Sequence, residues 1–176
     1  VLVTGRPLST EWIAENVPAL INAWEPGMYG GQAVAEILYG KVNPSAKLAI
    51  TIPRSVGQTQ MIYNHKPSQY FHPYVVTSSE PLYPFGFGLS YTDYEYSDLT
   101  LASEEIAADG SLKVSVKVTN SGDMAGTEIV QLYLRDVFSQ VTRPVKELKD
   151  FARVELAAGE SKVVEFTVTP DKLMFL

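Results

Sequence analysis

Residues 23–63 read AWEPGMYGGQAVAEILYGKVNPSAKLAITIPRSVGQTQMIY, and this stretch decides the fold of the first part of the chain. A glycine-rich turn at 26–31 opens a short amphipathic helix, which is expected to end at Gly40. A turn at 43–45 then leads into a strand over 47–52, so helix and strand alternate as in an α/β domain. The buried face of the helix is marked by apolar residues at helical spacing, namely Val34, Ile37 and Leu38.

Shorter segments upstream extend this pattern. Val1–Val3 and residues 19–24 are apolar runs typical of buried parallel strands, and a Ser-Thr pair at 9–10 can cap a short helix over 11–14. Strands and helices that alternate at this spacing predict right-handed crossovers and a parallel sheet over residues 1–53. Because three strands make a small sheet with two faces to cover, we expect further strands of this sheet to precede the chain.

Residues 54–92 differ in composition from both neighbouring regions. Their prolines and aromatic residues follow no lasting period, yet disordered segments are poor in aromatic residues. We therefore expect an ordered, extended strap that packs on two domains. Within it, Tyr70–Tyr74 either stacks on sugar rings or anchors the strap, and the anchor is favoured. His65 and His72 are expected to pack and form hydrogen bonds, because a metal site needs at least three ligands; neither a metal nor a cofactor is expected.

Residues 93–176 have the pattern of an all-β domain. Val114, Val116 and Val118 alternate with polar neighbours, as a half-buried strand requires. Turn clusters such as 120–123 separate further short strands, and this predicts a β-sandwich. We count about five strands where a closed sandwich has about seven, so this domain is expected to be incomplete.

Composition and charge exclude several classes of function. The chain has 176 residues and a net charge of −6, which argues against a nucleic-acid partner, since phosphates are bound by clustered Lys and Arg. It has no cysteine, so disulfides, thiolate nucleophiles and zinc–sulfur sites are excluded. No apolar stretch approaches the ~20 residues of a membrane helix, and no membrane partner is expected.

Blocks of sequence along nearly the whole chain resemble motifs of glycoside hydrolase family 3, which includes β-glucosidases and β-xylosidases. Any one block is weak, but their order and spacing together are specific. The blocks are VLVTGRPL at 1–8, WEPGMYGG at 24–31, VAEILYG at 34–40, NPSAKL at 43–48, IPRSVGQ at 52–58, LYPFGFGLSY at 82–91, VQLY at 130–133 and RPVKELK at 143–149.

This resemblance implies a domain plan and an activity. Residues 1–53 correspond to the end of an α/β sandwich domain, 54–92 to a strap linker, and 93–176 to an incomplete fibronectin type III-like (immunoglobulin-like) β-sandwich, with truncation at both ends. The implied activity is retaining hydrolysis of terminal, non-reducing β-linked sugars in carbohydrate catabolism, which uses two carboxylates about 5–5.5 Å apart.

The catalytic residues of the family lie outside the matched blocks. The nucleophile is an Asp of a barrel domain, and the acid/base is usually a Glu earlier in the α/β sandwich domain. We therefore assign no catalytic residue here and expect the chain alone to be inactive. Its expected partners are a glycoside or oligosaccharide substrate and the missing barrel and sandwich segments.

The loop at 24–31 departs from the family pattern and carries two candidates for the rim of the sugar site. The family loop usually ends Glu-Gly-Gly, whereas Tyr29 stands in the place of that Glu and Glu25 lies earlier. Both follow the end of a predicted parallel strand, where ligands bind in open α/β sheets. The alternative, which is favoured, is a helix-entry loop in which Glu25 interacts with the helix dipole.

A non-catalytic carbohydrate-binding or adhesive pair of modules is the alternative function, because a fibronectin-like sandwich does not fix function. Sequence upstream would distinguish them, since a barrel with an Asp nucleophile indicates a hydrolase and repeated sandwiches indicate adhesion. The periplasm or secretion is favoured over the cytoplasm.

Overall fold

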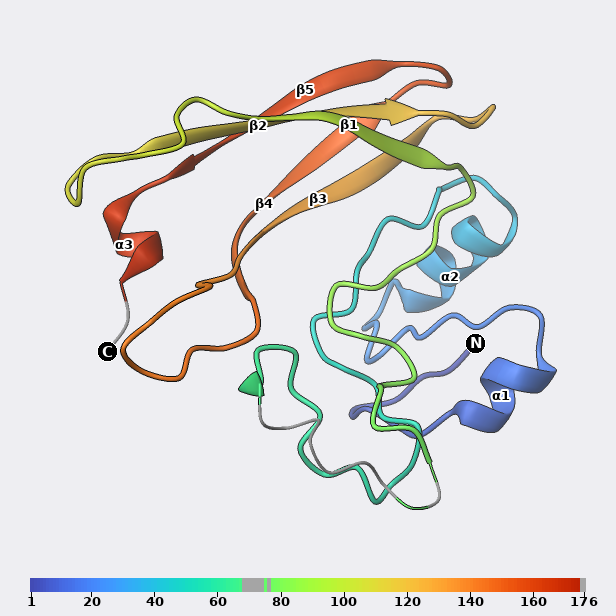
Figure 1. The fold of residues 1–176 in the computed structure, drawn as a ribbon. Coiled ribbons are helices and arrows are strands. Elements are labelled where there is room, and N and C mark those ends of the chain that lie inside the picture. The colour runs from blue at the N-terminus through green and yellow to red at the C-terminus, as the bar shows by residue number, and fades with distance from the viewer. Residues whose placement is uncertain (68–74, 76, 175–176) are drawn as a thin grey trace. The chain divides into compact units, whose positions relative to one another are not determined.

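The computed structural model describes residues 1–67, 75 and 77–174, and Figure 1 traces them. The chain divides into two compact units, each made of three segments. Unit 1 comprises Val1–Val42, Lys47–Gly88 and Arg135–Lys146. Unit 2 comprises Asn43–Ala46, Leu89–Leu134 and Glu147–Leu176.

Unit 1 contains the two helices that the sequence predicts in its first part. These are α1 (Glu11–Asn16) and α2 (Gly30–Leu38). Just beyond α2, Gly40 has a φ of +71°, a backbone conformation that favours glycine and stops the helix. The predicted end of α2 at this glycine is therefore confirmed.

The predicted parallel pairing in unit 1 is present, but only as a single bridge between Leu2 and Asn22. Two hydrogen bonds of 2.8 Å flank it, from Leu2 N to Ile21 O and from Ala23 N to Leu2 O. Thr4 N adds a third, to Trp24 O at 3.2 Å. The first two predicted strands therefore lie side by side and run in the same direction.

The third predicted strand, 47–52, does not join this pair, so that prediction is wrong. Its backbone bonds instead to the strap, in an antiparallel bridge between Ile52 and Tyr83. The N–H of Leu48 donates to Phe87 O at 2.8 Å, and Gly86 N donates back to Leu48 O at 2.7 Å. An apolar run does not show which neighbour satisfies the backbone groups of a segment.

Aromatic rings stack on one another in the described part of the strap. The rings of Tyr63 and Phe85 are stacked with their centroids 4.1 Å apart. Those of Tyr83 and Phe87 are stacked at 5.2 Å. Tyr70–Tyr74, including His72, lie outside the described residues.

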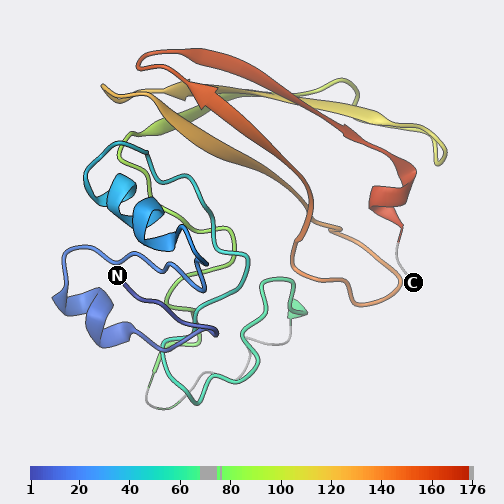
Figure 2. The same ribbon diagram turned by 180° about the vertical axis from the view of Figure 1, so that it is seen from behind.

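Unit 2 is the predicted all-β sandwich with five strands (Figures 1 and 2). One antiparallel sheet has the order β1-β2-β5, and the other pairs β3 with β4. A short helix, α3 (Pro170–Leu173), follows the last strand. The strands are β1 (Tyr94–Leu101), β2 (Leu112–Asn120), β3 (Gly126–Leu134), β4 (Glu147–Leu156) and β5 (Ser161–Val168).

The core of unit 2 lies between these two sheets. Its buried members come from four strands: Val118, Val130, Leu156, Val164 and Phe166. The alternation of β2 places Val114 and Val118 inside, as predicted.

Asn120 and Tyr96, at the edge of this core, form hydrogen bonds through their side chains. Asn120 is fully buried and donates to Met124 O at 2.8 Å, while its Oδ1 accepts the Thr92 hydroxyl at 2.6 Å. The Tyr96 hydroxyl donates to the buried carboxylate of Glu128 at 2.8 Å. Burial, together with this carboxylate, raises the pKa of Tyr96, so the phenol remains a donor.

Candidate functional site

The loop that follows the parallel bridge carries the two candidate rim residues, and it begins with an unusual backbone conformation. Trp24 has a φ of +50°, which bulky residues rarely adopt. Its N–H donates to Asn22 Oδ1 at 3.2 Å, and its carbonyl accepts Thr4 N at the same distance. These bonds hold Trp24 at the carboxyl end of the bridged segments, where α/β folds bind ligands.

Glu25 lies directly against the first of these segments. A Cβ atom built on Gly5 would collide with Glu25 Oε1, so the absence of a side chain at Gly5 makes room for the carboxylate. Glu25 is exposed and, among residues 1–67, 75 and 77–174, its side chain has no hydrogen-bond or ion-pair partner.

Glycines shape the rest of the loop. Gly27 has a φ of +69°. A Cβ on Gly30 would lie 2.5 Å from Pro26 Cγ, so the proline ring occupies the space of a side chain. Tyr29 precedes α2 and is 71% exposed. The first turn of α2 contains no acidic residue, and Glu25 lies outside it.

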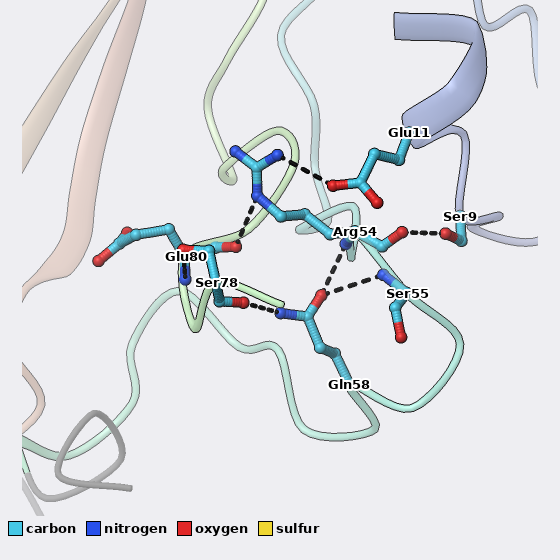
Figure 3. Close-up of polar contacts among 7 residues, drawn as sticks. All are labelled: Ser9, Glu11, Arg54, Ser55, Gln58, Ser78 and Glu80. Atoms are coloured by element: carbon cyan, nitrogen blue, oxygen red, sulfur yellow. Dashed lines mark hydrogen bonds and ion pairs between the residues drawn. The ribbon is translucent and has the colours of Figure 1, made fainter. Parts of the chain in front are cut away.

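A second polar cluster, centred on Arg54 and Gln58, was not assigned a role from sequence (Figure 3). Gln58 is only 4% exposed. Its Oε1 accepts the backbone N–H groups of Arg54 at 2.7 Å and Ser55 at 3.2 Å. Its Nε2 donates to Ser78 O at 2.8 Å. One amide side chain thus closes a turn and ties it to a segment 20 residues further along.

The Arg54 side chain and carbonyl extend this cluster to other parts of unit 1. Its Nε donates to Glu80 O at 3.2 Å, and its Nη1 lies 3.3 Å from Glu11 Oε1 on α1. The Ser9 hydroxyl donates to the Arg54 carbonyl. The IPRSVGQ block therefore acts as a structural clasp on α1 and the strap, and its arginine is engaged by protein groups rather than free for a ligand.

Two other family blocks are partners of one another. In unit 2, Asn43 Oδ1 accepts the Ser90 hydroxyl at 3.0 Å and Tyr91 N at 2.9 Å. In unit 1, Lys47 Nζ donates to Gly88 O at 3.3 Å. The NPSAKL and LYPFGFGLSY blocks are thus joined by hydrogen bonds, and no local pattern in either block indicates this pairing.

The described residues contain no constellation for a metal ion. His65 is 6% exposed, and its Nδ1 lies 2.9 Å from Lys66 O. No group of three or more metal-ligating side chains occurs in the part of the chain that the structure describes. Within that same part, no helix is both long enough and apolar enough to cross a membrane.

Comparison with known proteins agrees with this arrangement. The model of the glycosyl hydrolase family 3 C-terminal domain matches residues 1–91, and that of the fibronectin type III-like domain matches 128–176. A β-xylosidase of Formosa agariphila is 45% identical over 100% of this chain and 25% of its own length. A periplasmic β-glucosidase of Salmonella typhimurium is 42% identical over 99% of this chain and 24% of its own.

Solved structures give the same result. A β-glucosidase from Erythrobacter marinus superposes with a TM-score of 0.94 and 48% identity, over 97% of this chain and 22% of that one. The chain spans about a quarter of the length of the curated relatives it matches. The family model covers more than half of the chain, and the relatives align along nearly all of it. The chain therefore belongs to glycosyl hydrolase family 3.

Proposed function

We propose that this chain is the C-terminal portion of a retaining β-glycoside hydrolase that removes terminal, non-reducing β-linked glucose or xylose. The observation that carries the proposal is similarity along the whole chain to a β-xylosidase and to β-glucosidases. The matched family model is a C-terminal domain, which is consistent with a supporting role for this chain in a larger enzyme.

Retention at the anomeric carbon needs a nucleophilic carboxylate and a second carboxyl group about 5–5.5 Å away. The rim loop, 24–31, carries a single carboxylate, Glu25. We place both catalytic carboxylates in other parts of the protein, namely a barrel domain and the earlier part of the α/β sandwich domain. Residues 1–176 alone are then inactive.

Glu25 and Tyr29 form part of the rim of the sugar site in this proposal. Glu25 has an exposed carboxylate without a protein partner among the described residues, suited to accept hydrogen bonds from sugar hydroxyls. Tyr29 offers an exposed ring and a hydroxyl. The position of the loop after two parallel segments supports this role.

The remaining regions support the site. Residues 1–53 are the end of the α/β sandwich domain, 54–92 the strap linker, and 93–176 the fibronectin type III-like domain. The last two brace the region that carries the acid/base. A periplasmic or secreted enzyme is proposed, and the name of the Salmonella relative supports this location.

The test is hydrolysis of p-nitrophenyl β-glucoside and β-xyloside by the natural protein that carries this chain and by residues 1–176 alone. The natural protein should hydrolyse one or both, and NMR of the first-formed sugar should show the β-anomer. No hydrolysis, or an inverted product, would contradict the assigned activity. Hydrolysis by residues 1–176 would contradict the placement of the carboxylates.

A further inference from the structure

We infer that units 1 and 2 unfold in a single cooperative transition. Each unit includes one short segment that lies, along the sequence, between two segments of the other unit. Six segments alternate between the units along the chain, so the backbone passes from one to the other five times. Domains joined by a linker need a single passage. This inference does not rest on the proposed function.

The first inserted segment is Asn43–Ala46, which belongs to unit 2 although Val42 and Lys47 on its two sides belong to unit 1. Asn43 anchors it through the hydrogen bonds to Ser90 and Tyr91. Its Nδ2 is buried, and together with the Tyr94 hydroxyl it fills the space that a side chain at Gly126 would need. The segment Asn43–Ala46 is therefore held by other residues of unit 2.

The second inserted segment is Arg135–Lys146, which connects β3 to β4 yet belongs to unit 1. Val145 N donates to the carbonyl of buried His65 at 3.0 Å. Arg143, whose side chain is 12% exposed, lies 3.8 Å from Asp136 at the other end of the segment. The pairing of β3 with β4 holds both ends of this segment in unit 2.

Loss of unit 2 would therefore damage unit 1 at two places. Separation of β3 from β4 would free both ends of Arg135–Lys146. The segment would then lose more conformational entropy on ordering than it does when the strand pair holds its ends together. Release of Asn43 would also free the turn between α2 and residues 47–52. Unfolding of unit 2 while unit 1 stays folded is thus unfavourable, as expected for a single transition.

Two optical signals can report separately on the two units of residues 1–176. Both tryptophans, Trp12 and Trp24, lie in unit 1, whereas all five strands lie in unit 2. Urea unfolding should be followed by tryptophan fluorescence and by far-UV circular dichroism in the β-sheet region. We expect coincident curves. Two resolved midpoints would overturn the inference.

A matched pair of variants on β5 tests the coupling itself. Val164 is 6% exposed in the core of unit 2, and Val163 beside it is 64% exposed. Val164→Ala should lower the urea midpoint of both signals by the same amount, and Val163→Ala should change both much less. A shift of the dichroism midpoint with an unmoved fluorescence midpoint would overturn the inference.

Hydrogen exchange of the unsubstituted chain gives an independent measurement if Val164→Ala does not fold. The amides of Ile52 in unit 1 and Val118 in unit 2 should exchange through the same opening, with equal dependence on urea. Exchange of Ile52 through an easier opening that leaves Val118 protected would overturn the inference.

Discussion

The Oε1 atom of Gln58 accepts a hydrogen bond from the backbone N–H of Arg54 at 2.7 Å. This bond closes the turn between the two residues. The same amide donates to Ser78 O in the strap. Because Gln58 is buried, its hydrogen bonds have no water to replace them, and the conformation of this turn depends on one side chain.

Gln58→Ala should therefore lower the free energy of unfolding by about 1–3 kcal/mol, because it leaves the half-buried N–H groups of Arg54 and Ser55 without their acceptor. The exposed neighbour Thr59 gives the control, and Thr59→Ala should change stability by less than about 0.5 kcal/mol. Urea denaturation of the two variants and the parent chain measures the difference. Equal midpoints for both variants would show that the turn does not need Gln58.

Two adjacent glycines should respond oppositely to alanine. Gly30→Ala places a Cβ against the ring of Pro26, so it should destabilise the chain by about 1–3 kcal/mol. Gly31→Ala meets nothing within 4 Å and lies inside α2, where alanine is the better helix former, so it should stabilise by up to about 1 kcal/mol. Thermal unfolding of both variants measures the sign, and a lower Tm for Gly31→Ala would contradict this account.

Stability in acid should depend on the pair formed by Asp150 and Lys172, whose charged atoms are 2.5 Å apart. The hydrogen bond from Lys172 lowers the pKa of Asp150 in the folded state. A lowered pKa stabilises the fold above the pKa of the unfolded carboxyl group, and this contribution is lost as the pH falls through the folded value. Both side chains are partly exposed, so the contribution should be less than about 1 kcal/mol.

Asp150→Asn should remove this contribution near neutral pH and change little below the folded pKa. Lys172→Met should flatten the same part of the stability–pH curve, and the double variant should add nothing further. Urea midpoints between pH 2 and 7 measure these curves. Additive losses in the double variant would mean that the two residues act separately.

Glu25 should matter for binding in the natural enzyme if it lines the sugar site. Glu25→Gln replaces a charged acceptor by a neutral one, so kcat/KM should fall roughly 10–100-fold, as expected for a hydrogen bond to a charged group. Glu15→Gln, at an exposed position on α1, is the matched control and should leave kcat/KM unchanged. An unchanged kcat/KM for Glu25→Gln would remove Glu25 from the site.

Periodicity and turn chemistry predicted the elements whose causes are local. The helix that ends at Gly40 follows from apolar spacing and a glycine stop, and the strand centred on Val116 follows from simple alternation. These signals act over a few residues, so they can be read without knowledge of the tertiary structure.

The errors and omissions concern partners far apart in the chain. Residues 47–52 bend at 49–50 and bond to the strap at 48 and 52, and the spacing of their apolar residues contains no information about that choice. Asn43 bonds to residues 47 and 48 positions away, and Gln58 to a carbonyl 20 positions away. A polar side chain in a turn signals that a hydrogen bond is needed, but only the folded chain shows where the partner lies.

Strands β3 and β4 form a sheet of two, so each has one edge with no strand beside it among residues 1–67, 75 and 77–174. Backbone N–H and C=O groups along such an edge are a template for another strand. A strand supplied by the same protein would extend the sheet, and a strand supplied by a second copy would join two chains edge to edge. In the isolated chain, strands of the same protein and strands of a second copy would therefore compete for the same open edges of this two-stranded sheet.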